Sequence, residues 1–112
     1  MKGTLLTYSA DGQIAERGLT EPPSAADLQS IVGGWIELVP SFNTCRVGND
    51  VRHCRVFCNE DGKRENLPVN VVATAARYDA MKRQGLMNSS FDDFLVGAVA
   101  IVIGDRELME GL

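Results

Sequence analysis

The three cysteines and the single histidine are the residues whose types and spacing first suggest chemistry. Cysteine and histidine are the ligands that zinc prefers, and Cys45, His53, Cys54 and Cys58 lie close together in the chain. On an extended strand, however, Cys54 and Cys58 are about 13 Å apart at ~3.3 Å per residue. Zinc requires both sulfurs at about 2.3 Å from the metal. The sequence therefore predicts no metal site and no cofactor.

A cysteine activated by histidine is the second chemical possibility. Adjacent residues on a strand point to opposite faces, so His53 is not expected to activate Cys54. A single histidine and scattered carboxylates leave few groups for acid–base catalysis near neutral pH. We therefore expect a protein that is not an enzyme. The odd number of cysteines is unlike an extracellular disulfide framework and indicates reduced thiols in a cytoplasm.

Positive charge gathers in residues 45–64, although the whole chain has a net charge of -4. The window holds five cations and three carboxylates, so its own net charge is +2. One interpretation is a patch whose arginine forks bind phosphate or carboxylate groups. The favoured interpretation is a solvated strand edge that charge protects from pairing with other strands. The candidate anion-binding residues are Arg46, Arg52, Arg55 and Lys63.

The elements that position these residues are expected to form one small domain. A chain of 112 residues, of which 45% are hydrophobic and 23% charged, can bury a modest core without metal or disulfides. We expect a single domain over residues 1–112, ordered over about residues 3–104. The polar tail, residues 105–112, is expected to be partly ordered at best.

Charge and hydropathy also limit the partners of the chain. The mild negative charge argues against a nucleic-acid partner, which would normally require a basic face. The longest apolar run, residues 94–103, is about half the ~20 residues that a membrane-spanning helix needs. No secretory signal is visible at the start of the chain. A soluble protein of the cytoplasm, away from the membrane, is the expectation.

The first part of the chain predicts a hairpin, a helix and a strand. Residues 3–19 alternate like a β-hairpin, and Asp11-Gly12 favours a tight turn with both φ angles positive. Ser24 is a typical helix N-cap, and Gly33 can take the left-handed conformation that ends a helix. Gly34 then lets the chain reverse into a strand over residues 35–39. Trp35 is expected in the core rather than at an interface.

The middle of the chain predicts an exposed loop and a second hairpin. Residues 41–50 are polar and rich in turn formers, so we expect a loop on the surface. A strand is predicted over about residues 51–58, followed by a turn in which Gly62 takes a positive φ. The returning strand should be short, because Pro68 lacks a backbone donor.

The last part of the chain predicts a helix and a central strand. Asn70 is expected to cap a helix over residues 71–84 that Gly85 ends, with a buried stripe at Val72, Ala75, Ala76 and Ala80. Residues 95–103 are apolar throughout and rich in β-branched residues, which is typical of a strand inside a sheet. The predicted fold is therefore α+β, with a mixed, mainly antiparallel sheet of four to five strands packed by two helices.

Four segments, taken in this order, resemble a known family. They are residues 28–37, 58–63, 67–70 and 95–98, and structural roles are expected in or beside them for Gly33, Gly34, Trp35, Gly62, Pro68, Asn70 and Gly97. The set resembles domain of unknown function 3846, a family of small proteins common in bacteriophages, prophages and plasmids. The resemblance extends from about Leu5 to Ile103. It implies a mobile-element setting in a bacterial cytoplasm, and it brings no catalytic residues.

That setting leads to two functional hypotheses. The first is an accessory protein that binds a host protein, for instance to counter a defence system, with contacts from Phe42, His53, Arg77 and Phe91. Two departures from the family pattern, residues 41–50 and 77–93, would be natural places for such contacts. The alternative is a protein that sequesters a small anionic signal such as a cyclic nucleotide, held by the four cations named above. An open sheet edge would also allow a homo-oligomer.

Overall fold

The apolar strand near the end of the chain forms the centre of the sheet. Strand β7 (Val99–Gly104) pairs with β1 (Gly3–Tyr8) on one side and with β6 (Arg55–Asn59) on the other. Four consecutive residues of β7, from Val99 to Val102, are fully buried. The predicted central position is confirmed, since apolar side chains cover both faces of this strand.

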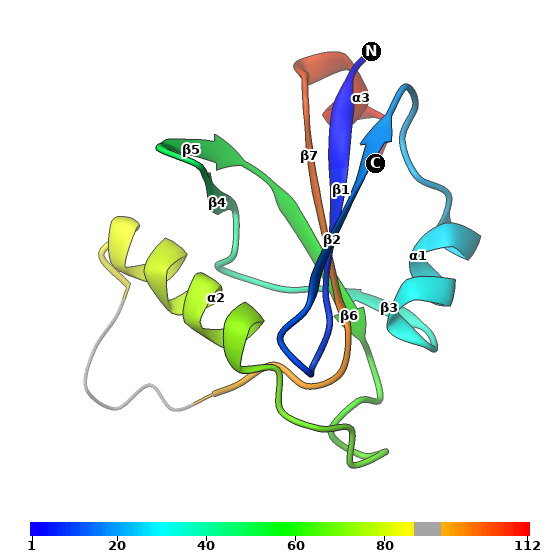
Figure 1. Cartoon of the computed structure of the whole chain (residues 1–112), viewed down its shortest axis with the longest axis vertical. Coiled ribbons are helices and arrows are strands. Elements are labelled where there is room, and N and C mark those ends of the chain that lie inside the picture. The colour runs from blue at the N-terminus through cyan, green and yellow to red at the C-terminus, as the bar shows by residue number, and fades with distance from the viewer. Residues whose placement is uncertain (87–92) are drawn as a thin grey trace.

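The computed structural model, which describes residues 1–86 and 93–112, has an α+β fold as predicted (Figure 1). Its five-stranded sheet has the order β2-β1-β7-β6-β3, where β2 is Ile14–Leu19 and β3 is Ile36–Leu38. A separate two-stranded sheet pairs β4 (Thr44–Val47) with β5 (Asp50–His53). Every strand pairing described is antiparallel.

Two hydrophobic clusters lie on the two faces of the five-stranded sheet. On one face, α1 (Ala25–Val32) and α3 (Arg106–Glu110) pack on side chains such as Leu5 and Val102. On the other face, α2 (Val71–Arg83) and the β4–β5 hairpin cover side chains such as Leu6, Val56 and Ile101. Figure 1 shows α1 and α2 on opposite sides of the strands. No helix in the described residues is long and apolar enough to cross a membrane.

The caps of the two predicted helices are confirmed. The Ser24 side chain accepts a hydrogen bond from the Asp27 backbone N–H, and Gly33 ends α1 with a φ of 80°. Asn70 caps α2 by accepting from the Ala73 N–H. The Asn70 Nδ2 group also donates to the carbonyls of Tyr8 and Gly97, each at 2.8 Å. Asn70 therefore joins the start of α2 to two distant segments, which explains its complete burial.

Two predicted turns have a different geometry. The β1–β2 hairpin forms, but only Gly12 of the Asp11-Gly12 pair has a positive φ, because the turn is a longer one that the Ser9 N–H closes on the Gln13 carbonyl. The turn after β6 contains no positive φ at Gly62; Asn66 holds the left-handed conformation instead. Gly62 is needed for space, since a Cβ there would lie 2.8 Å from Val96 Cγ2.

The return after this turn is not a hairpin strand. The Pro68 carbonyl accepts from the Gly97 N–H, and Val69 forms an isolated bridge with Val96. Gly97 has a φ of 70°, which favours glycine at this contact. Pro68 and Gly97 are thus structural, as predicted, but they join two loops rather than two strands.

The expectation of an exposed loop over residues 41–50 is wrong. The segment contains β4 and the first residue of β5, and Phe42, only 2% exposed, is among the largest buried side chains. Cys45 is also buried, and the strand predicted over residues 51–58 is divided at Cys54 into β5 and β6. The polar neighbours of Phe42 and Cys45 made the segment look like a surface loop. Which side chains of an irregular segment are buried is determined by the tertiary fold and not by the local sequence.

For the C-terminal half, the expectation for the tail is wrong and the expectation for α2 is confirmed only in part. The tail is ordered: Asp105 caps α3, and Leu108 is fully buried against the sheet. In α2, Ala80 of the predicted stripe is buried and Val72 and Ala76 pack partly buried against the core, whereas Ala75 is exposed. The stripe is therefore confirmed except at Ala75, and the burial of the long Arg77 side chain on the same helix was not predicted.

Candidate functional site

Strand β3 forms one edge of the sheet, and its hydrogen bonds show which of its backbone groups are free. The Trp35 carbonyl accepts from the Glu60 N–H and the Val39 N–H donates to the Val56 carbonyl, both at 2.8 Å. Hydrogen bonding alternates along an antiparallel strand, so the N–H and C=O groups of Ile36 and Leu38 point away from β6. Among the described residues, no strand lies beyond β3.

Apolar side chains are exposed along this edge. Trp35 is 68% exposed and Leu38 is 54% exposed, whereas Ile36 is half-buried against the cluster beneath α1. Trp35 also borders a shallow hollow with Ala26, Gln29, Ser30 and Gly34. The expectation that Trp35 belongs to the core is therefore wrong, because no described element lies beyond β3 to cover it.

A pocket of about 230 Å³ lies on the other face of β3, toward α2. The α2-facing residues Glu37 and Val39 of this segment form part of its wall, and β6 and the residues after it form another part. Its lining residues are Glu37, Val39, Pro40, Cys58, Asn59, Glu60, Lys63, Arg77, Asp93, Phe94, Leu95 and Val96. The pocket thus combines five charged side chains of opposite sign with several apolar residues.

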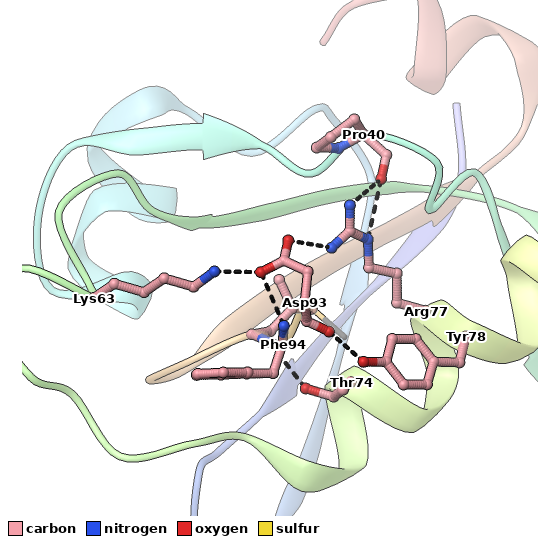
Figure 2. Close-up of polar contacts among 8 residues, drawn as sticks. Pro40, Lys63, Thr74, Arg77, Tyr78, Asp93 and Phe94 are labelled. Carbon is pink, nitrogen blue, oxygen red and sulfur yellow. Dashed lines mark hydrogen bonds and ion pairs between the residues drawn. The ribbon is translucent and has the colours of Figure 1, made fainter. Parts of the chain in front are cut away.

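Arg77 connects helix α2 to the end of β3 from beneath this pocket. Its Nε and Nη2 atoms donate to the Pro40 carbonyl at 3.2 and 3.0 Å, and Nη1 lies 3.1 Å from the Asp93 carboxylate (Figure 2). The residue is only 6% exposed. Arg77 was predicted as a partner contact on the surface, and that is wrong, because its guanidinium is buried and is used to hold the chain just after β3.

Asp93 forms ion pairs with both cations of the pocket. Lys63 donates to the Asp93 carboxylate from the opposite side to Arg77, and the Tyr78 hydroxyl donates to the Asp93 carbonyl (Figure 2). The hydrogen bond from Lys63, followed by that from Arg77, holds the pKa of Asp93 below its ordinary value of 3.8. Lys63 also lies 5.0 Å above the Phe94 ring. Asp93 therefore stays ionised and neutralises part of the charge of both Lys63 and Arg77.

Glu37 and Glu60 are the carboxylates of the pocket that remain uncompensated. Both residues are exposed, and neither side-chain carboxylate has a hydrogen bond or ion pair among the described residues. Glu37 lies opposite Cys58 in the β3–β6 ladder, and Glu60 lies opposite Trp35. With three carboxylates and two cations, the pocket has a net negative charge, and one of its two free carboxylates, Glu37, lies on the open edge strand.

The thiols are not activated as nucleophiles. Burial raises the pKa of Cys54 to about 12 and that of Cys58 to about 11, and it also raises the pKa of Cys45. The Cys54 thiol donates to the Phe42 carbonyl at 3.8 Å. All three cysteines are free, and no group of three or more potential metal ligands occurs in the described residues. Such thiols stay protonated at neutral pH, which disfavours both nucleophilic attack and metal binding.

The four predicted anion-binding residues do not converge on one site. Arg46 and Arg52 lie on β4 and β5, and Arg46 is 3.9 Å from Asp79. Arg55 begins β6 and donates to the Leu112 carbonyl, whereas Lys63 lies beyond the other end of β6 and binds Asp93. A single phosphate could not contact this set, so the structure gives the anion-sequestering hypothesis no common pocket.

The remaining predicted partner contacts lie in different environments. His53 is exposed at the end of β5, opposite Thr44. Phe42 is in the core and cannot form a surface contact, so that prediction is wrong. Phe91 lies outside the described residues. Sequence reasoning missed Glu37, Leu38 and Glu60. The available signal was the short alternating strand after the Gly33-Gly34 break. Its apolar residues could have been considered as an exposed sheet edge, because no later segment was clearly predicted to pair with that strand.

Comparison with known proteins identifies a family but no activity. The model of the family described as Domain of unknown function (DUF3846) matches residues 4–109. Neither the curated proteins nor the solved structures include a significant match. The family match covers the sheet, the helices and the edge described above.

Proposed function

The chain belongs to the DUF3846 family, and from this premise we propose that it is a non-enzymatic binding protein that takes up an extended segment of a partner protein at β3. The segment would add a sixth strand to the sheet by pairing with the outward N–H and C=O groups of Ile36 and Leu38. The open backbone of β3 beside the exposed Trp35 is the observation that supports this function.

The physical basis is strand addition. Main-chain hydrogen bonds to an open edge supply affinity, and the side chains along that edge supply selectivity. Tryptophan is among the residues that contribute most to binding when a partner covers it. Trp35 and Leu38 together offer apolar surface that a partner would remove from water.

The setting implied by the family resemblance gives the partner its context. Small accessory proteins of phages, prophages and plasmids act in the bacterial cytoplasm, so the proposed partner is a host protein. Interference with a defence protein is one role that fits such a complex. The protonated thiols are in keeping with a binding protein.

Two proline substitutions test this function as a matched pair. The Leu38 N–H points outward, so Leu38→Pro removes a donor for an added strand without removing a bond to β6. In β2, the Ser9–Gln13 bond sets an alternation in which the Glu16 N–H also points outward, so Glu16→Pro is the equivalent change at the other edge. Circular dichroism would first establish that both variants fold.

The measurement is retention of proteins from a bacterial lysate, quantified by mass spectrometry. We expect a host protein that the wild type and Glu16→Pro retain equally, and that Leu38→Pro retains at least about tenfold less. Equal retention by Leu38→Pro, or no retained protein with any of the three, would contradict the proposal.

A further inference from the structure

The two faces of β3 differ in chemistry, and the difference restricts what kind of strand could pair with it. Successive side chains of a strand point to opposite faces, and directly opposite residues of neighbouring strands share a face. Ile36 and Leu38 point to the apolar α1 face, and Glu37 between them points to the pocket on the α2 face. An added strand would therefore have one side chain beside Glu37 and apolar neighbours on either side of it.

The pocket next to Glu37 favours a cationic side chain. Its own cations, Lys63 and Arg77, are both bound to Asp93, so an incoming anion would have to displace an ion pair that is already formed. The carboxylates of Glu37 and Glu60 have no such partners among the described residues; Glu37 lies on the open edge strand, and Glu60 follows β6, opposite Trp35. A directly opposite pair of unlike charges stabilises a strand pairing, whereas like charges oppose it.

The apolar part of the pocket suits the stem of the same side chain. Val39, Phe94 and Leu95 line it beside the carboxylates, and its volume of about 230 Å³ is several times the ~30 Å³ of one water. Lysine and arginine bury an apolar stem while their charged end stays near polar groups. A long basic side chain can therefore satisfy both parts of the pocket, which a short or acidic side chain cannot.

We infer that the strand received by β3 has a lysine or arginine opposite Glu37, flanked on both sides by apolar residues that face Ile36 and Leu38. This inference rests on the proposed strand addition and specifies its partner: an extended apolar–basic–apolar segment of a protein. The basic side chain enters the pocket between β3 and α2, with its charge at Glu37 and Glu60. The flanking apolar side chains extend the surface formed by Leu38.

A displayed library of random seven-residue peptides tests the inference without knowledge of the natural partner. The library is panned against the wild type, Glu37→Lys, Glu37→Gln and Leu38→Pro, with Glu16→Lys as the control that makes the same charge change at the other edge. We expect the wild type and Glu16→Lys to enrich a basic residue between two apolar ones. Glu37→Gln should weaken this preference, and Glu37→Lys should replace it by aspartate or glutamate.

The enriched peptide then gives the magnitude. Trp35 is the only tryptophan, so its fluorescence reports binding at the edge directly. Replacement of the peptide's basic residue by glutamine should raise the Kd about tenfold at low salt, with a smaller difference at high salt. The inference is overturned if the preference for a basic residue persists in Glu37→Lys, or if the wild type shows no such preference. In either case, loss of binding in Leu38→Pro would still support the proposed strand addition at β3. If no peptide is enriched, or if Leu38→Pro enriches the same peptides, the inference and the proposed function both fail.

Discussion

The two edge strands of the sheet, β2 and β3, leave backbone groups open in different ways. The six residues of β2 include the exposed charges Glu16 and Arg17, and Arg17 pairs with Asp27 at 3.4 Å. The three residues of β3 have Trp35 before them and end at the exposed Leu38. Charged side chains are a common protection of an edge against unwanted pairing, and apolar ones invite it. The comparison favours β3 as the edge suited to a partner, because Trp35 and Leu38 are both exposed there, whereas Ile14 is the exposed large apolar side chain of β2.

The edges also differ in how firmly they are held. The buried Arg77 fixes the carbonyl of Pro40, directly after β3, and is itself paired with Asp93. β2 is held by its pairing with β1 and by an exposed ion pair to α1. A strand held in place loses less freedom when a partner pairs with it, so this anchor suits the proposed role of β3.

The largest effect should distinguish the two aromatic residues beside β3. Phe42→Ala removes a fully packed side chain and should lower the free energy of unfolding by about 3–5 kcal/mol. Trp35→Ala removes a mostly exposed side chain and should lower it by less than about 1 kcal/mol. Urea unfolding followed by circular dichroism measures both, without dependence on tryptophan. A large loss of stability in Trp35→Ala would mean that this edge is part of the core.

The second test compares an arginine at each edge. Arg77→Ala leaves the Pro40 carbonyl without its side-chain donor, removes one of the two cations bound to Asp93 and opens space beneath the pocket, so stability should fall by about 2–3 kcal/mol. Arg17→Ala breaks an exposed ion pair and should change stability by less than about 0.5 kcal/mol. The same urea titrations decide the result. Equal losses of stability in the two variants would show that Arg77 holds its edge no more firmly than Arg17 holds β2.

The third test uses the thiols on the β3 side of the sheet. Because burial raises the pKa of Cys54 and Cys58 from 9.0 to about 12 and about 11, the folded state favours the neutral thiols. Their contribution to stability is complete below pH 9 and is lost as the pH rises through the folded pKa values. Cys58→Ala should therefore flatten the decline in stability between about pH 9 and pH 11. An unchanged alkaline profile would show that Cys58 is accessible to water.

The smallest effect should come from Asp93. Its pKa is lowered in the folded protein by Lys63 and Arg77, so its contribution is present above the ordinary value of 3.8 and is lost as the pH falls through the lowered value. The Asp93 side chain is 45% exposed, and we expect this contribution to be less than about 1 kcal/mol. Asp93→Asn should flatten the acid decline of stability, as measured by urea unfolding between pH 2 and 6. A steeper acid decline in the variant would reverse the assignment.

Local signals in the sequence were sufficient for the helices and the central strand. Ser24, Gly33 and Asn70 act within a few residues of their own positions, and each has the predicted role in a cap. The run of apolar residues at β7 predicted a buried strand for a similarly local reason, since no polar face was present. Such features depend on the chain's own dihedral angles and periodicity, so neighbouring residues are enough to reveal them.

The candidate site could not be predicted in the same way. Whether Trp35 or Phe42 is buried depends on which elements pack over each one, and those elements come from distant parts of the chain. The pairing of Lys63 with Asp93 spans 30 residues and takes one cation out of the predicted anion site. The sequence shows that these charges exist, but it does not show which of them neutralise one another.

The position of β7 at the centre of the sheet has a consequence for synthesis on the ribosome. The hairpin of β1 and β2 and the pair of β3 and β6 both precede β7 in the chain, yet it is β7 that joins them within the sheet. Before those residues are made, the strands β1 and β6 lack their common neighbour, and the apolar side chains that pack around β7 remain exposed to water. We therefore expect the five-stranded sheet to form in one cooperative step once residues 99–104 are available.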